Sequence, residues 1–88
     1  MIRKHLTVRT PQGLHMRAAA KIRRISQQQR CRVHLQNERG EQAAAESLVE
    51  MLSLGAVSGT PLQVTVTGDN AGDALAMIEE VFENGAGI

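Results

Sequence analysis

The residues best suited to chemistry form a short run, Gly13-Leu14-His15-Met16-Arg17, at a turn that leads into a helical pattern. Neutral imidazole is a good nucleophile near physiological pH, and its nitrogen can carry a transferable group. The free N–H groups and positive dipole of a helix N-terminus would stabilise an anion on His15, and Arg17 could add charge-assisted hydrogen bonds to phosphate oxygens. The run therefore predicts reversible phosphoryl transfer through His15, with Arg17 stabilising the phosphate.

The same run also has a simpler interpretation. A single G-x-H-x-R pattern has low specificity, so His15 could be an ordinary residue at a helix N-terminus and Arg17 a solvated charge. Cys31 and His34 offer no stronger alternative, because alternation puts them on opposite sides of an expected strand, and two ligands do not make a zinc site. We expect no metal site and no cofactor.

The elements that must position His15 follow from changes in the apolar period. Thr10-Pro11-Gln12-Gly13 predicts a turn, because proline fixes φ and glycine permits positive φ. Asn37-Glu38-Arg39-Gly40 predicts a tight turn between two strands. The expected order is strand 2–9, helix from 16, strand 31–36, strand 41–44, helix 47–55, strand 62–66 and a helix after 69–70. This order favours an α+β fold, βαββαβα, with an antiparallel sheet covered on one face by helices.

Length and charge bound the kind of molecule. The 88 residues carry a net charge of only +1, and the length fits one domain, 1–88, with residues 84–88 forming either a tail or the start of a linker. All ten lysines and arginines lie in residues 1–40, where Glu38 is the only carboxylate, and the other eight carboxylates lie in 41–88. The basic half indicates a surface that meets negative charge.

Composition excludes several classes of protein. The chain contains no apolar run of about 20 residues and its N-terminus lacks the apolar centre of a signal peptide, so we expect no membrane insertion. Cys31, the single cysteine, is typical of a reducing cytoplasm. Phe82 is the only aromatic residue, which argues against nucleic-acid modules that stack bases on aromatic side chains. We expect a cytoplasmic monomer that binds no nucleic acid.

Two separated motifs resemble the HPr family of histidine phosphocarriers of the bacterial phosphotransferase system. Thr10-Pro11-Gln12-Gly13-Leu14-His15-Met16-Arg17-Ala18-Ala19 is similar to that family's active-site pattern, Gly-Leu-His-x-Arg-Pro-Ala. Ser47-Leu48-Val49-Glu50-Met51-Leu52-Ser53-Leu54-Gly55 resembles the segment around the family's regulatory serine and short second helix. With the element order, the resemblance covers residues 2–83 and implies an open-faced β-sandwich of four strands and three helices.

The resemblance implies that His15 accepts a phosphoryl group from Enzyme I, which takes it from phosphoenolpyruvate, and passes it to an enzyme II A-type acceptor, as in sugar transport. Arg17 would stabilise the phosphate. The chain would then be a phosphoryl carrier that shares the transferase chemistry with its partners, rather than a stand-alone catalyst. An alternative is an HPr-like regulatory adaptor that binds and controls other proteins, including in a nitrogen-type branch. A nucleic-acid-binding α/β domain rests only on the basic half and is disfavoured by the missing aromatic residues.

Departures from the family pattern concern partners more than chemistry. Ala18 stands where the family has proline, and both residues suit the first turn of a helix. Glu46 and Glu50 lie where many relatives of the carbohydrate branch carry lysine, and this reversed charge should alter partner choice. We expect the docking residues to be Met16, Glu46, Leu48, Val49, Glu50 and Met51.

Ser47 has two interpretations. It could be the site of a regulatory kinase, or it could be the N-cap of the short helix, in a capping box with Glu50. The carboxylates of Glu46 and Glu50 would crowd a phosphoserine. The sequence therefore favours the cap alone.

Overall fold

The computed structural model describes residues 1–84 and confirms the expected element order. The expected tail or linker at 84–88 falls, from residue 85 on, outside the described residues. The elements are β1 (Ile2–Thr7), α1 (Met16–Gln28), β2 (Arg32–Gln36), β3 (Gln42–Ala44), α2 (Leu48–Ser53), β4 (Pro61–Thr67) and α3 (Ala71–Asn84).

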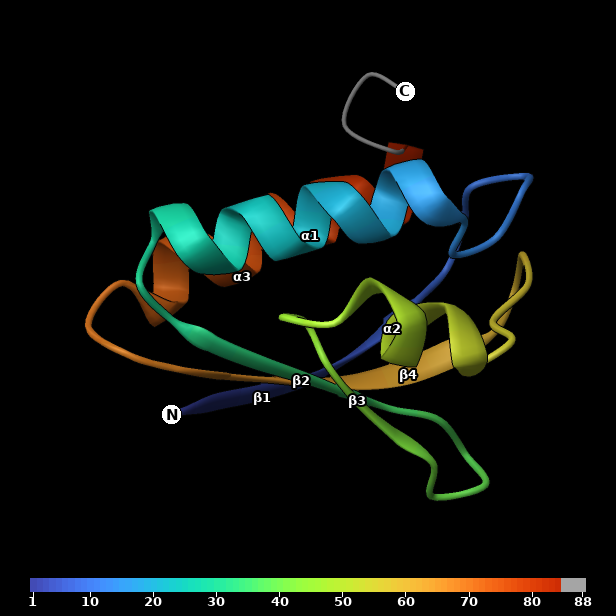
Figure 1. Cartoon of the computed structure of the whole chain (residues 1–88), viewed down its shortest axis with the longest axis horizontal. Helices are drawn as coiled ribbons and strands as arrows, with labels where there is room; N and C mark the ends of the chain where they lie inside the picture. The colour runs from blue at the N-terminus through green and yellow to red at the C-terminus, as the bar shows by residue number, and fades with distance from the viewer. Residues whose placement is uncertain (85–88) are drawn as a thin grey trace.

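The four strands form one antiparallel sheet in the order β1-β4-β2-β3, and the three helices lie over one of its faces (Figure 1). β4 pairs with β1 on one side and β2 on the other, so Val64 lies opposite both Lys4 and Leu35. Because side chains alternate along a strand, this register gathers the apolar residues on the helical face. The fold is thus the predicted open-faced α+β sandwich.

The core fills the space between sheet and helices. α1 buries the stripe that its 3.6-residue period predicts, and α3 does the same from its own apolar face. The largest fully buried side chains are those of Ile22, Leu35, Met51, Leu62, Ile78, Val8, Val64, Val66 and Val81.

Lys4 interrupts the inward apolar face of the edge strand β1. Its Nζ atom lies 3.0 Å from Oε1 of Glu79 on α3, and both side chains are partly exposed at the margin of the sandwich. A charge is tolerated here because β1 is an edge strand, so the long side chain of Lys4 can extend past the core and place its amino group in water.

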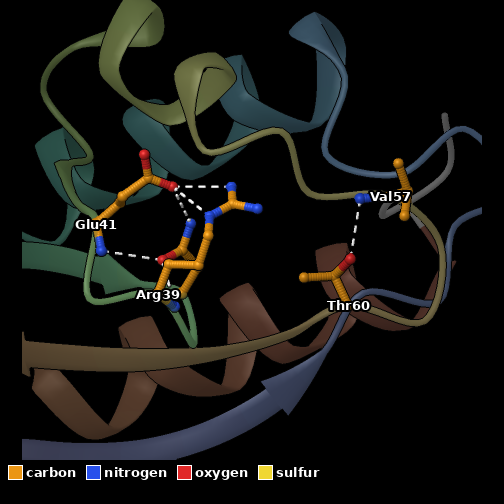
Figure 2. A network of polar contacts seen from close by, with 5 residues as sticks. Arg39, Glu41, Val57 and Thr60 are labelled. Carbon is orange, nitrogen blue, oxygen red and sulfur yellow. Dashed lines mark hydrogen bonds and ion pairs between the residues drawn. The ribbon is translucent and has the colours of Figure 1, made fainter.

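The predicted turn between β2 and β3 is held by the buried side chain of Asn37. Its Oδ1 accepts the N–H groups of Arg39 and Glu41, and its Nδ2 donates to Glu41 Oε1 at 2.8 Å. Arg39 binds the same carboxylate oxygen, with Nη2 at 2.8 Å (Figure 2). The hydrogen bond from Asn37, followed by that from Arg39 and the charge of Arg39, lowers the pKa of Glu41. The hairpin therefore keeps a charged carboxylate at its turn.

Neighbouring substitutions on α1 should separate core from surface. Ile22 is fully buried, whereas Arg23 is exposed and its side chain forms no hydrogen bond or ion pair within residues 1–84. We expect Ile22→Ala to lower the free energy of unfolding by about 2–5 kcal/mol and Arg23→Ala to change it by less than about 0.5 kcal/mol. Urea unfolding of both variants measures this. Equal effects would contradict the packing of α1 described above.

Candidate functional site

The turn that precedes α1 brings His15 to the start of the helix. Gly13 N–H donates to the carbonyl of Thr10 at 2.9 Å, and the buried Thr10 hydroxyl donates to the carbonyl of Gly13 at 2.7 Å. Both ends of the predicted turn are therefore tied together, and His15 follows directly as the N-cap residue of α1.

The loop between α2 and β4 supports this turn from the side. The N–H of Leu14 donates to the carbonyl of Ala56 at 2.9 Å, and Val8 exchanges backbone hydrogen bonds with Gly59 and Thr60. In Figure 1 the two loops meet at the same end of the sandwich. The second loop is itself closed by the hydrogen bond from Val57 N–H to Thr60 Oγ1, seen in Figure 2.

Gly13 is required at this contact for two reasons. Its φ of +71° lies in the left-handed region, and a Cβ atom there would sit 2.5 Å from the carbonyl oxygen of Ala56 and 2.8 Å from the Cα of Val57. Any side chain would push the two loops apart. The glycine of the motif is thus explained by a backbone contact with a segment more than forty residues away.

The imidazole of His15 is turned back over the helix end. Its Nδ1 atom accepts hydrogen bonds from the backbone N–H groups of Arg17, at 3.2 Å, and Ala18, at 3.4 Å. An Nδ1 that accepts is unprotonated, so the proton of the neutral ring lies on Nε2. The nucleophilic lone pair therefore points at the two N–H groups and the positive end of the α1 dipole.

Arg17 lies in the first turn of α1 with its side chain exposed. Within residues 1–84 the ion pairs involve the cations Lys4, Arg9 and Arg39, so the Arg17 guanidinium is not held by a carboxylate. α1 contains no acidic residue at all. The guanidinium is available to an anion carried on His15.

Within residues 1–84, His15 lines none of three surface hollows of the chain. A hollow of about 490 Å³ lies between the β2–β3 turn and the α2–β4 loop, and His15 is not among its lining residues. The imidazole is half-buried at the open end of a helix. Such a group suits exchange with another protein better than the enclosure of a small substrate.

One docking assignment is wrong. Met51 is fully buried on the inner side of α2, so its side chain is part of the core and cannot contact a partner. Apolar periodicity could not distinguish it from its neighbours, because a helix of six residues is too short to define which apolar side chains face inward.

The other residues predicted to dock a partner fall at accessible positions. Met16 and Val49 are exposed, at 62% and 74%, Glu46 and Glu50 are exposed, and Leu48 is half-buried against the core. Val57, which the sequence did not single out, is 65% exposed in the loop that packs on Gly13. The position of Val57 follows from the long-range contact between the two loops, which no local sequence pattern predicts.

Ser47 is the N-cap of α2, and its Oγ accepts the N–H of Glu50 at 3.2 Å. The reciprocal half of the predicted capping box is absent. Glu50 Oε1 instead accepts the N–H of Ala44 at 3.0 Å, while Ser47 N–H donates to the carbonyl of Ala44. The Glu50 carboxylate thus ties α2 to the end of β3.

Two negative findings concern residues 1–84. No group of three or more histidine, cysteine, aspartate or glutamate side chains could hold a metal ion there. None of the helices in this part of the chain has the length and apolar character needed to cross a bilayer.

This fold, an antiparallel sheet of four strands covered on one face by three helices, is the fold of small phosphocarrier domains. The family model described as "PTS HPr component phosphorylation site" matches residues 2–84. The chain belongs to the HPr family of phosphocarriers of the phosphotransferase system.

Relatives of several kinds support this assignment. The chain is 33% identical over 73 residues to phosphocarrier protein NPr of Escherichia coli, covering 83% of this chain and 81% of that protein. It is 31% identical over 84 residues to phosphocarrier protein HPr of Xylella fastidiosa, covering 96% and 93%. It is also 35% identical over 82 residues to the multiphosphoryl transfer protein of Haemophilus influenzae, covering 91% of this chain but 16% of that protein.

Solved structures show the same fold. HPr-C-His from Thermoanaerobacter tengcongensis superposes with a TM-score of 0.87 at 20% identity, covering 100% of this chain and 98% of that chain. HPr from Bacillus anthracis superposes with a TM-score of 0.83 at 22% identity, covering 92% and 95%.

Substitution of two glycines should isolate the contact behind His15. Gly55 has a φ of +64°, close to that of Gly13, but nothing lies within 4 Å of a Cβ built on it. Gly55→Ala should therefore cost only the backbone strain of about 1–2 kcal/mol. Gly13→Ala should cost more and should also shift the NMR signals of the His15 ring, because it separates the two loops. Matching losses of stability with an unchanged His15 spectrum would contradict the role of this contact.

Proposed function

We propose that Nδ1 of His15 accepts a phosphoryl group from an Enzyme I-type protein, charged from phosphoenolpyruvate, and passes it to an enzyme II A-type acceptor. The observation that carries the proposal is the orientation of the His15 ring, whose unprotonated nitrogen faces two backbone N–H groups at a helix N-terminus. Family membership supports the same role for the chain. The proposed setting is the cytoplasm, where a single buried thiol, Cys31, stays reduced.

Transfer to His15 forms one bond to phosphorus and breaks another. The His15 ring turns so that the Nδ1 lone pair leaves the N–H groups of Arg17 and Ala18 and attacks phosphorus. The P–N bond forms, and the bond between phosphorus and the donor breaks with its electron pair remaining on the donor. The proton stays on Nε2, which leaves the ring cationic and therefore a good leaving group. In the onward step the acceptor's nucleophile attacks phosphorus and the electron pair of the P–N bond returns to Nδ1.

The surroundings of His15 stabilise charge at the point where it is transferred. The incoming oxygens meet the N–H groups of the first turn of α1 and the positive end of its dipole. The guanidinium of Arg17 adds donors that fit phosphate oxygens. The chain supplies a positioned acceptor, and the partner supplies the remainder of the catalytic machinery.

The exposed side chains of Met16, Val49 and Val57 are proposed to meet the partner, with Lys21 and Arg24 of α1 steering its approach. Glu46 and Glu50 bring negative charge to the α2 part of the same surface. The proposed role of Ser47 is to cap α2 rather than to receive a phosphate, since its Oγ accepts the N–H of Glu50 and the exposed carboxylates of Glu46 and Glu50 would crowd a phosphoserine.

Substitution of the acceptor tests the proposal directly. With phosphoenolpyruvate and a cognate Enzyme I, the wild-type chain should gain one acid-labile phosphate, and His15→Ala should gain none because the nucleophile is gone. Phosphorus NMR and intact-mass measurement detect the phosphate, and His34→Ala, at an exposed position on β2, is the matched control. Labelling of His15→Ala at the wild-type level would overturn the proposal.

Removal of the guanidinium should slow transfer without unfolding the chain. Arg17→Ala is expected to reduce the transfer rate by about tenfold to a hundredfold. This is the effect expected when one or two charge-assisted hydrogen bonds are lost from the transition state. Arg23→Ala, another exposed cation of α1, should leave the rate nearly unchanged. Rapid-quench kinetics compare the two, and equal rates in both variants and wild type would remove Arg17 from the mechanism.

A further inference from the structure

The N–H of Ala18 adds a second backbone donor at the reacting nitrogen. Counting from the N-cap His15, Ala18 is the third residue of α1, and its N–H is one of those that the helix leaves without a helical acceptor. It lies 3.4 Å from Nδ1, close to the 3.2 Å of the Arg17 N–H. The family pattern places proline at this position, and proline has no N–H to donate.

We infer that the Ala18 N–H binds the phosphoryl group carried on His15 and thereby favours the phosphorylated state of this chain. This inference rests on the proposed function of His15. In the free chain the N–H meets the lone pair of a neutral ring, whereas in the phosphorylated chain it meets anionic oxygens. Hydrogen bonds to charged acceptors are roughly twice as strong as those between neutral groups, so the donor gains strength when His15 is phosphorylated.

Burial makes this donor effective. The Ala18 residue is 1% exposed, and its methyl group packs in the core beside Ala19 and Ile22. The backbone at Ala18 is therefore fixed, and its N–H does not have to be ordered when the phosphoryl group arrives. A preorganised donor gives more stabilisation to the bound anion than a mobile one.

Two consequences are measurable. The equilibrium between the phosphorylated donor and this chain should lie further toward phosphorylated His15 than it would with proline at position 18. Spontaneous hydrolysis should also be slower with the N–H present. In that reaction water attacks phosphorus, the P–N bond breaks, its electron pair returns to Nδ1, and inorganic phosphate leaves.

Ala18→Pro and Ala18→Gly form the matched pair, since proline removes the N–H and glycine retains it. With Enzyme I and phosphoenolpyruvate supplied, we expect Ala18→Pro to lower the equilibrium constant for phosphorylation of His15 by about threefold to tenfold. Ala18→Gly should stay within about twofold of wild type. Phosphorus NMR gives the equilibrium and the hydrolysis rate, and urea unfolding of both variants measures any structural loss separately.

A second variant removes the N–H without a proline ring. Cys31 allows a synthetic segment of residues 1–30 to be ligated to residues 31–88, so Ala18 can be replaced by lactic acid, which puts an ester oxygen in place of the N–H. This chain should show the same shift as Ala18→Pro. An equilibrium and a hydrolysis rate equal to wild type in the ester chain would overturn the inference, as would equal shifts in Ala18→Gly and Ala18→Pro. Absence of phosphate from wild-type His15 would instead overturn the proposed function.

Discussion

The contact between two backbone segments at one end of the sandwich is the constraint on which the site depends. The N–H of Leu14 donates to the carbonyl of Ala56. Because Gly13 has no Cβ atom, the two backbone segments can approach this closely. Because this contact fixes the turn before α1, it also fixes where His15 begins the helix. The Nδ1 atom of His15 is therefore positioned by main-chain groups.

The contrast between the two halves of the sequence becomes a contrast between elements in the folded chain. α1 carries only cations, α3 carries only carboxylates, and none of the four strands contains an aspartate or glutamate. Four of the ten cations lie on α1, three lie on β1 and β2, and the other three lie in turns and loops. Only the four cations of α1 lie on the helix that His15 caps, so less than half of the basic charge lies on that element.

Periodicity and turn chemistry predicted the fold well. The stripe of α1, the alternation of Val33 and Leu35, and the turn at Asn37–Gly40 are local patterns, and each occurs where local physics puts it. His15 and Arg17 were recognised for the same reason, since their chemistry and spacing lie within five residues. The family resemblance then supplied the role that this short pattern could not establish by itself.

What the sequence could not predict depends on distant contacts or on very short elements. The burial of Met51 is decided by how six residues of α2 sit on the sheet, and Glu50 binds Ala44 because β3 ends beside it. The approach of Ala56 to Gly13 crosses more than forty residues of chain. Rules for helix caps and amphipathic stripes describe neighbouring residues, so they do not predict contacts between segments that are far apart in the sequence.

The ion pair between Lys4 and Glu79 bears on how copies of this chain behave toward one another. Both edges of the sheet are poor templates for an added strand, because β1 carries this charge on its inward side and β3 is only three residues long. Inward charges and short edges are established means of preventing sheets from extending between molecules. A carrier that meets several proteins in turn can therefore reach a high concentration without polymerising through its strands. Its contacts with other proteins are then made by its helices.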